Sequence, residues 1–174
     1  MEIINARDLT QRQWYLFVLL YKRYFRNEYV KKVTNPIINR AKMYLTGGGL
    51  AEQSLYNIKC GALTSFVILL PDEKEHGKVP IGFITGYETI EGILKLNDIY
   101  LEYPSHSLKI EMLKRLYRQF VTLASTHGID TIQGASNDMM PEKTNYLLSL
   151  GLNPDSFKDT TIYKAHIMLP KEEK

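Results

Sequence analysis

An amphipathic segment of twenty residues, closed by a glycine, is the feature that most constrains how this chain folds. Within residues 108–127 the apolar side chains recur at intervals of three and four, which is the period of a helix with one buried face. They are Leu113, Leu116, Tyr117, Phe120, Val121 and Ala124. Gly128 follows directly, at the place where a glycine commonly ends a helix. We therefore predict one long helix over residues 108–127.

Short apolar runs on both sides of this helix predict β-strands. The runs are rich in β-branched and aliphatic residues, and glycine, proline or polar residues bound them. They are Glu2–Ala6, Leu63–Leu70, Ile81–Tyr87, Leu94–Leu101, Thr131–Ala135 and Thr161–Leu169. Residues 71–79 are polar and charged, so we expect them to join the second and third of these strands as a hairpin.

Two segments near the amino terminus predict helices. The first begins after Thr10, which together with Gln13 has the pattern of a capping box, and runs to about Arg26. Asn35-Pro36 is a favourable start for the second helix, with asparagine as the cap and proline in the first turn. It ends at about Leu45, before three successive glycines.

A shorter helix over Glu142–Leu150, ended by Gly151, completes the set of elements. The predicted order is β α α β β β α β α β. Mixed and alternating elements of this kind predict an α/β fold with a mixed central sheet flanked by helices. The length of the chain suits one domain, so we expect residues 1–174 to form a single domain.

The first helix is apolar around most of its surface. One stripe is formed by Trp14, Phe17, Val18, Tyr21 and Phe25. The stripe is widened by Leu16, Leu19, Leu20 and Tyr24. A helix of this kind is either deeply buried or covered by a partner.

Positive charge is concentrated in the same part of the chain. Residues 1–45 hold nine Lys/Arg against three Asp/Glu, whereas the whole chain carries a net charge of +3. Such a basic end suits an acidic partner surface or phosphate, and it also suits a solvated helix face. We expect a protein partner or self-association through this helix. Its aromatic residues lie at core spacing, which argues against a stacking platform for nucleic acid.

The composition excludes several classes of protein. The one cysteine, Cys60, excludes a disulfide framework and a multi-cysteine zinc site. The four histidines show no metal-ligand spacing, so we predict no metal site. The longest apolar run, Trp14–Tyr21, is far shorter than the roughly 20 residues that cross a bilayer. We expect no membrane segment and a cytoplasmic location.

The order of elements and two segments resemble the GNAT N-acetyltransferases. Leu96–Leu101, followed by Pro104, resembles the family's fourth strand and the start of its coenzyme A loop. Asn145–Leu152 resembles the family's closing L-Y-x-x-L-G-F motif. The resemblance spans roughly residues 60–169. It implies the GNAT fold, in which coenzyme A carries the acyl group that an amine accepts.

The resemblance is incomplete at the coenzyme A loop. The family binds the pyrophosphate on backbone N–H groups of a Q/R-x-x-G-x-G/A sequence at the start of the long helix. This chain has no glycine between Gly92 and Gly128. Counted forward from Pro104, the basic and glycine positions of the motif hold Ser107, Ile110 and Met112. Counted back from Gly128, they hold Leu108, Glu111 and Leu113.

Coenzyme A contacts are therefore expected mostly through the backbone. The resemblance implies as cofactor-binding residues Leu101, His106, Ser107, Lys109, Ile110 and Met112. A side chain at each glycine position stands where a phosphate approaches, and Glu111 adds a like charge on one of the two counts. We predict weak or no coenzyme A binding, with acetyl-coenzyme A as the cofactor if the chain is an enzyme.

Candidate catalytic residues follow from the same resemblance. Many members place a carboxylate on the fourth strand as the base for the amine, and Asp98 or Glu102 fits here, with Glu88 as a third option. The tyrosine that protonates the leaving thiolate lies four residues before the closing glycine, where this chain has Leu147. Tyr146 is one residue away, a turn of about 100° on a helix. The alternatives are strand-edge charges in water and a packing tyrosine.

Two functions remain open from the sequence. The first is a non-catalytic GNAT-like scaffold or assembly component, because the closing helix is similar to that of GNAT-like virion proteins of short-tailed bacteriophages. A virion is then the expected location. The alternative is an acetyl-coenzyme A-dependent N-acyltransferase that acts on an amine of unknown identity. The lost loop glycines lead us to favour the scaffold.

Overall fold

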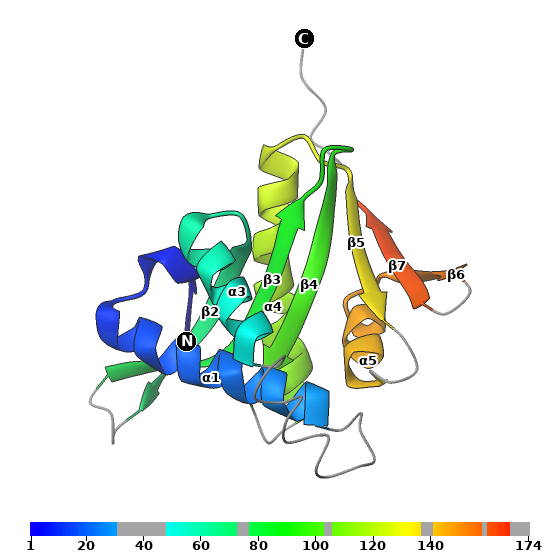
Figure 1. Cartoon of the computed structure of the whole chain (residues 1–174). Helices are drawn as coiled ribbons and strands as arrows, with labels where there is room; N and C mark the ends of the chain where they lie inside the picture. The colour runs from blue at the N-terminus through cyan, green and yellow to red at the C-terminus, as the bar shows by residue number, and fades with distance from the viewer. Residues whose placement is uncertain (31–47, 73–76, 103–105, 137–140, 158–159, 168–174) are drawn as a thin grey trace. The chain divides into compact units, whose positions relative to one another are not determined.

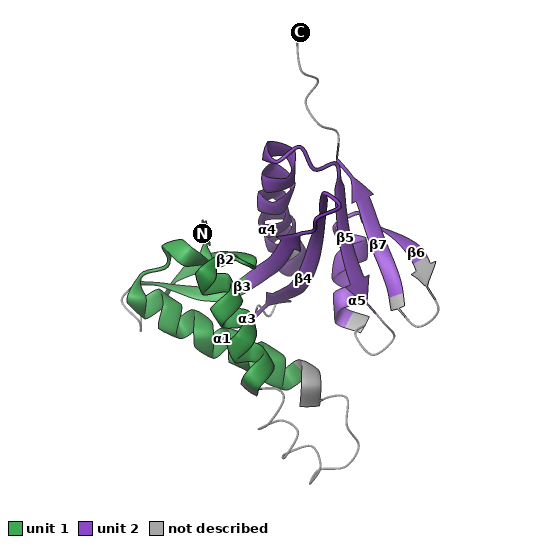
Figure 2. Cartoon of the chain, turned by 45° about the horizontal axis from the view of Figure 1, so that its top comes forward, with its two compact units in different colours: residues 1–82 green, residues 83–174 purple. Residues whose placement is uncertain are grey.

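The computed structural model describes residues 1–30, 48–72, 77–102, 106–136, 141–157 and 160–167. Two compact units divide the chain, residues 1–82 and residues 83–174, and Figure 2 colours them separately. In the described part of the chain seven strands are hydrogen-bonded in the order β1-β2-β3-β4-β5-β7-β6. The sheet is mixed, because β4 and β5 are parallel whereas β5 and β7 are antiparallel. The predicted α/β class with a mixed sheet is confirmed.

The described residues of the first unit form two strands, two α-helices, a short 3-10 helix and the start of a third strand (Figure 1). Its elements are β1 (Glu2–Asn5), the short 3-10 helix η1 (Ala6–Asp8), α1 (Gln11–Val30), α3 (Gly48–Cys60), β2 (Thr64–Asp72) and the first part of β3 (Gly77–Glu88). β1 lies antiparallel to β2, with Glu2 opposite Leu69 and Asn5 opposite Phe66. α1 packs against α3.

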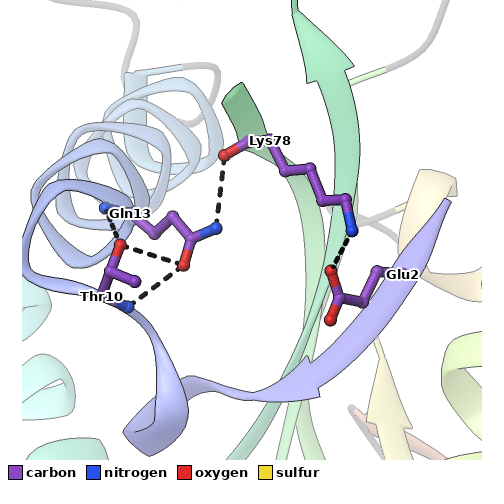
Figure 3. Close-up of polar contacts among 4 residues, drawn as sticks. All are labelled: Glu2, Thr10, Gln13 and Lys78. Atoms are coloured by element: carbon purple, nitrogen blue, oxygen red, sulfur yellow. Dashed lines mark hydrogen bonds and ion pairs between the residues drawn. The ribbon is translucent and has the colours of Figure 1, made fainter. Parts of the chain in front are cut away.

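The start of α1 is fixed by the predicted capping box (Figure 3). The Gln13 N–H donates to Thr10 Oγ1 at 3.3 Å, and the Thr10 N–H donates to Gln13 Oε1 at 3.1 Å. This reciprocal pair satisfies donors that a helix start otherwise leaves free. Gln13 Nε2 also donates to the Lys78 carbonyl at 3.5 Å, and Lys78 forms an ion pair with Glu2 at 2.8 Å. The first turn of α1 is thereby joined to β3, and β3 to β1.

The apolar surface of α1 is buried on more than the predicted stripe. Phe17, Tyr21 and Phe25 are buried as predicted, whereas Trp14 and Val18 are only half-buried. The residues that widen the stripe divide among the three burial classes: Leu20 and Tyr24 are buried, Leu16 is half-buried and Leu19 is exposed. Tilted and edge-to-face ring contacts join neighbouring aromatic residues of this helix.

The second unit holds the long helix and the parallel strands that it connects. Its elements are the end of β3, β4 (Ile93–Leu101), α4 (His106–Thr126), β5 (Thr131–Ser136), α5 (Pro141–Ser149), β6 (Asn153–Phe157) and β7 (Thr160–His166). β4 and β5 are neighbouring parallel strands, and the long helix α4 connects them along the chain. α4 packs against both strands, and α5 packs against β5 and α4.

Two glycines allow this close packing of helices on strands. A Cβ on Gly86 of β3 would lie 2.5 Å from the Lys95 carbonyl oxygen and 2.8 Å from the Phe120 ring of α4. A Cβ on Gly134 of β5 would lie 2.6 Å from Leu147 of α5. Because real Cβ contacts are longer than this, the spacing at Gly86 requires glycine, whereas a side chain at position 134 would force the end of the Leu147 side chain to shift.

Two elements differ from the prediction. The predicted helix that starts at Asn35-Pro36 lies outside the described residues. α3 is absent from the predicted elements, because three successive glycines typically end a helix. Instead, Gly48 and Gly49 begin a helix whose buried face is Ala51, Leu55 and Ile58.

The last part of the chain also differs from the prediction. One final strand was predicted, whereas the structure has two, β6 and β7, paired antiparallel with Asn153 opposite Lys164. β6 includes Pro154 and has no β-branched residue, so its sequence does not look like a strand. It stands last in the sheet order, where proline is tolerated because an edge strand has free backbone groups.

Candidate functional site

β4 and β5 begin as a paired ladder and then part. Their parallel register runs from Ile93 opposite Thr131 to Leu96 opposite Gly134, and it ends there. β4 continues to Leu101 and β5 to Ser136, and Figure 1 shows their ribbons separating toward these ends. We call this region, Asn97–Leu101 of β4 and Ala135–Ser136 of β5, the parting. Beyond Leu96 and Gly134 the two strands are therefore no longer paired with each other.

A lysine of α5 reaches the β4 edge of the parting. Lys143 Nζ donates to the carbonyl oxygen of Asn97 at 2.7 Å. The N–H of the same peptide unit, on Asp98, donates to Thr85 Oγ1 of β3 at 3.0 Å. Because the C=O and N–H of a trans peptide point in opposite directions, the Asn97 carbonyl points away from β3 and toward β5. Lys143 thus binds the first carbonyl oxygen that β5 leaves unpaired.

The next residue of α5 contacts the other edge. Thr144 Oγ1 donates to Ser136 Oγ at 2.9 Å, and Ser136 is buried at the end of β5. The other edge of β5 is fully paired, since β7 runs beside it from Thr131 opposite His166 to Ser136 opposite Thr161. The first turn of α5 therefore contacts both strands at the place where they separate.

The start of α5 is also tied to the start of α4. Lys109 Nζ forms an ion pair with Glu142 at 2.7 Å, and the lysine side chain is only 16% exposed. Tyr146 OH donates to the same carboxylate at 2.5 Å, and the Lys109 ammonium lies 5.2 Å from the centre of the Tyr146 ring. The three side chains form one cluster between the two helix starts, with the cation over an aromatic face.

Asp98 is the carboxylate of β4 beside the parting. It is buried, and its Oδ2 accepts hydrogen bonds from Thr85 Oγ1 at 3.2 Å and from Asn97 Nδ2 at 2.9 Å. The buried positions of β4 change from even to odd between Asp98 and Ile99, which is the change of phase that a β-bulge produces.

Three solved acetyltransferases align with this chain over nearly its whole length. No protein-family model and no curated protein matches the sequence. A GNAT-family acetyltransferase from Staphylococcus aureus aligns with a TM-score of 0.65 at 12% identity, over 96% of this chain and 99% of that one. The chain has the GNAT fold.

Two further structures support the GNAT fold over nearly the whole length. The PaiA N-acetyltransferase of Thermoplasma acidophilum, solved in complex with coenzyme A, aligns with a TM-score of 0.64 at 13% identity, over 95% of this chain and 99% of that one. The spermidine N-acetyltransferase of Vibrio cholerae, solved with coenzyme A and spermine, aligns with a TM-score of 0.57 at 15% identity, over 94% and 95%. At sequence identities this low, the structural alignments establish a shared fold and nothing more.

The candidate bases lie in different places on the GNAT fold. Asp98 is in the parting, and Glu102 is an exposed residue directly after β4. Glu88 instead forms an ion pair with His127 at 3.1 Å, just beyond the last turn of α4. α4 spans 21 residues, and at about 1.5 Å per residue its two ends are roughly 30 Å apart. Glu88 is therefore not brought to the parting.

The tyrosine candidate donates a hydrogen bond within its own helix. Leu147, at the place of the family tyrosine, is fully buried against Gly134 of β5. Tyr146 is also buried, but its hydroxyl group points to Glu142. Because Tyr146 lies one residue from the family position, its side chain has different neighbours from those of Leu147. Its role as a proton donor stays a prediction.

The expected cofactor-binding residues gather at the end of β4 and the start of α4. Leu101 is buried, Met112 is buried and Ile110 is half-buried. His106 and Ser107 form the first residues of α4, so His106 belongs to the helix, and their side chains lie outside the described part. Lys109 is committed to Glu142 and does not point freely into solvent.

Two residues at the parting, Lys143 and Thr144, are not among the site residues that the sequence predicts. Both follow a strand that the sequence does predict, and both lie in the first turn of a predicted helix. In an α/β fold the loops and helix starts after parallel strands meet at one edge of the sheet. That rule is the signal that points to them, but the partner carbonyl on β4 depends on the register and is not encoded locally.

Other kinds of site are not seen in the described residues. No three His, Cys, Asp or Glu side chains of that part of the chain gather as they would to hold a metal ion. No described helix is both long enough and apolar enough to cross a membrane. One side chain outside the parting has a strongly shifted pKa. Burial raises the pKa of Tyr117, on α4, to about 12.

Proposed function

We propose that this chain is an acyl-coenzyme A-dependent N-acyltransferase with acetyl-coenzyme A as its acyl donor. The observation that carries the proposal is the parting, where the parallel strands β4 and β5 end their pairing with each other and their edges separate. An extended chain with amide groups, such as the pantetheine arm, can add to such an edge by strand-like hydrogen bonds. Two GNAT structures of similar fold, those of PaiA and of the spermidine acetyltransferase, contain coenzyme A.

The chemistry asked of the protein is modest. The bound cofactor supplies the activated acyl group as a thioester. Backbone N–H groups of β4 in the parting would stabilise the negative charge that develops on the acyl oxygen. Asp98, with its hydrogen bonds to Thr85 and Asn97, is the proposed acceptor of the amine proton, and Glu102 is the exposed alternative. Orientation of the amine against the acyl carbon contributes the rest.

A non-catalytic scaffold is the second candidate, and one observation favours it. The Asn97 carbonyl, an acceptor that the donor cofactor would use, is already held by Lys143. The loop before α4 also lacks the glycines that bring phosphates close to the backbone. In this reading the partner surface is the exposed side of α1, where Tyr15 is 63% exposed and Leu19 is 43% exposed. A virion location belongs to this second candidate.

Thermal unfolding with and without acetyl-coenzyme A separates the two candidates. A ligand present at 100 times its dissociation constant stabilises a protein by about 2.7 kcal/mol, which is a shift of several degrees. We expect such a shift, together with release of free thiol when a polyamine or another primary amine is added. A melting temperature that does not move at millimolar acetyl-coenzyme A would contradict the acyltransferase and favour the scaffold.

A further inference from the structure

The first turn of α5 contacts three elements beside the parting. Lys143 binds β4, Thr144 binds β5, and Glu142 binds Lys109 of α4. We call these three consecutive residues the α5 turn. Two of its contacts, those of Glu142 and Thr144, hold the helix start in place without touching the backbone of either strand edge.

The contact made by Lys143 differs in kind, because it uses a main-chain acceptor of the parted edge. Asn97 is the first residue of β4 beyond the last pair with β5, and its carbonyl faces the parting. An extended ligand that adds to this edge pairs its amide N–H groups with these carbonyl oxygens. A lysine ammonium and a ligand amide therefore need the same acceptor in the same direction.

This inference rests on the proposed function. We infer that Lys143 gates the cofactor site: its ammonium holds the Asn97 carbonyl, and the pantetheine arm must displace it in order to pair with β4. The lysine stem has four rotatable bonds, so the ammonium can leave while the α5 turn stays anchored by Glu142 and Thr144. Lys143 thereby lowers the affinity for coenzyme A and acts as a determinant of how tightly the chain holds its donor.

The size of the effect follows from the bond that is lost. A hydrogen bond to a charged group is stronger than a neutral one, and its loss corresponds to a change of about 10- to 100-fold in an equilibrium constant. The ammonium regains water when it swings out, which keeps the effect toward the lower end of that range. Removal of the lysine should tighten binding by this factor.

Calorimetric titration with acetyl-coenzyme A of four full-length proteins tests the inference. They are the wild type, Lys143→Ala, Lys143→Met and Lys164→Ala. Met keeps most of the length of the side chain and cannot donate a hydrogen bond. Lys164→Ala is the matched control, because Lys164 forms an ion pair with Asp155 at 2.7 Å in the same unit, on β7 and away from the parting. Circular dichroism and a thermal melt confirm that each variant is folded.

We expect Lys143→Ala and Lys143→Met to bind about 10-fold more tightly than the wild type, with Lys164→Ala unchanged. Tighter binding by Lys143→Ala alone would assign the effect to side-chain volume and overturn competition for the carbonyl. Equal or weaker binding by both variants, with measurable wild-type binding, would overturn the gate and leave the proposed function standing.

The two proposals fail in different ways. If the wild type does not bind and both Lys143 variants do, the gate is supported and the acyltransferase proposal for the natural chain is overturned. If no protein of the four binds, both proposals are overturned. Tighter binding by the Lys164 variant as well would show a general charge effect and would also overturn the gate.

Discussion

The two halves of β4 follow different rules, although they belong to one strand. In the first half, Ile93–Leu96, the backbone pairs with β5, and α4 approaches so closely that Gly86 of the neighbouring strand has no room for a side chain. In the second half, Asn97–Leu101, the pairing with β5 has ended, and side chains of α5 and β3 bind the backbone of β4. Lys143 binds a carbonyl there, and Asp98 is held by Thr85.

The difference shows how one strand serves both stability and function. Backbone pairing and apolar burial in the first half are mutually supportive and leave nothing for a ligand to use. In the second half, side chains instead of β5 bind some of the backbone groups, and a side chain can be displaced. A site arises where regular pairing ends. Substitutions that disturb the first half should therefore cost the most stability, whereas those that remove side-chain partners of the second half should cost less stability and can also change binding.

The largest expected effect is in the paired half. Gly86→Ala places a Cβ against the Lys95 carbonyl, which is backbone and cannot move aside, so we expect a loss of about 3 kcal/mol in the free energy of unfolding. Urea denaturation measures it. Gly49→Ala is the control, because nothing lies within 4 Å of a Cβ there and stability should stay equal or rise slightly. Equal stability of the two variants would contradict the close approach of β4 and α4.

The second effect concerns the carboxylate in the parted half. Thr85→Val removes the hydroxyl group that donates to Asp98 Oδ2 and accepts from the Asp98 N–H, which leaves buried polar groups without this partner. We expect a loss of about 2 kcal/mol, whereas Thr85→Ser, which keeps the hydroxyl group, should lose less than half of that. If valine and serine destabilise equally, the methyl group of Thr85 contributes as much as its hydroxyl group, and a dominant role of the hydrogen bonds to Asp98 is contradicted.

A third prediction concerns alkaline pH and the helix that covers the paired half. Burial raises the pKa of Tyr117 to about 12, so the folded state favours the neutral phenol. Its contribution is complete below the unfolded pKa of about 10 and is lost as the pH rises toward 12, with a loss of about 1 kcal/mol by pH 11. Between pH 8 and pH 11, the stability of Tyr117→Phe should fall less than that of the wild type by this amount. Parallel pH profiles of the two proteins would contradict it.

The smallest expected effect is at the tyrosine between the helix starts. Tyr146→Phe removes one hydrogen bond to Glu142, whose side chain is 47% exposed, so the loss in stability should be below about 1 kcal/mol. Because the hydroxyl group points to Glu142 and not to the strands, we also expect the affinity for acetyl-coenzyme A to stay unchanged. A tenfold weaker affinity in the variant would place Tyr146 in the cofactor site.

The part of the fold that the sequence predicts is the part governed by local periodicity. The helix over residues 108–127 is observed as His106–Thr126, and the strands on either side of it are observed within about two residues at most ends. The sequence does not predict α3 and β6, because they contain glycines or a proline at positions that only tertiary contacts make acceptable.

The candidate site was predictable in place but not in detail. Asp98 and the end of the fourth strand follow from alternation and from the family resemblance. The bond between Lys143 and the Asn97 carbonyl depends on where β5 stops pairing, which is a property of register and twist summed over several strands. No pattern within α5 alone reports that contact.

The measurement that tests the central claim most directly is an amide chemical-shift titration of the isotope-labelled full chain with acetyl-coenzyme A. If the parting is the cofactor site, the largest changes will fall on the amides of Asn97–Leu101 and on the first turns of α4 and α5. Amides of the paired half, Ile93–Leu96, should change less. Saturable changes located elsewhere, or no changes at millimolar ligand, would contradict the account.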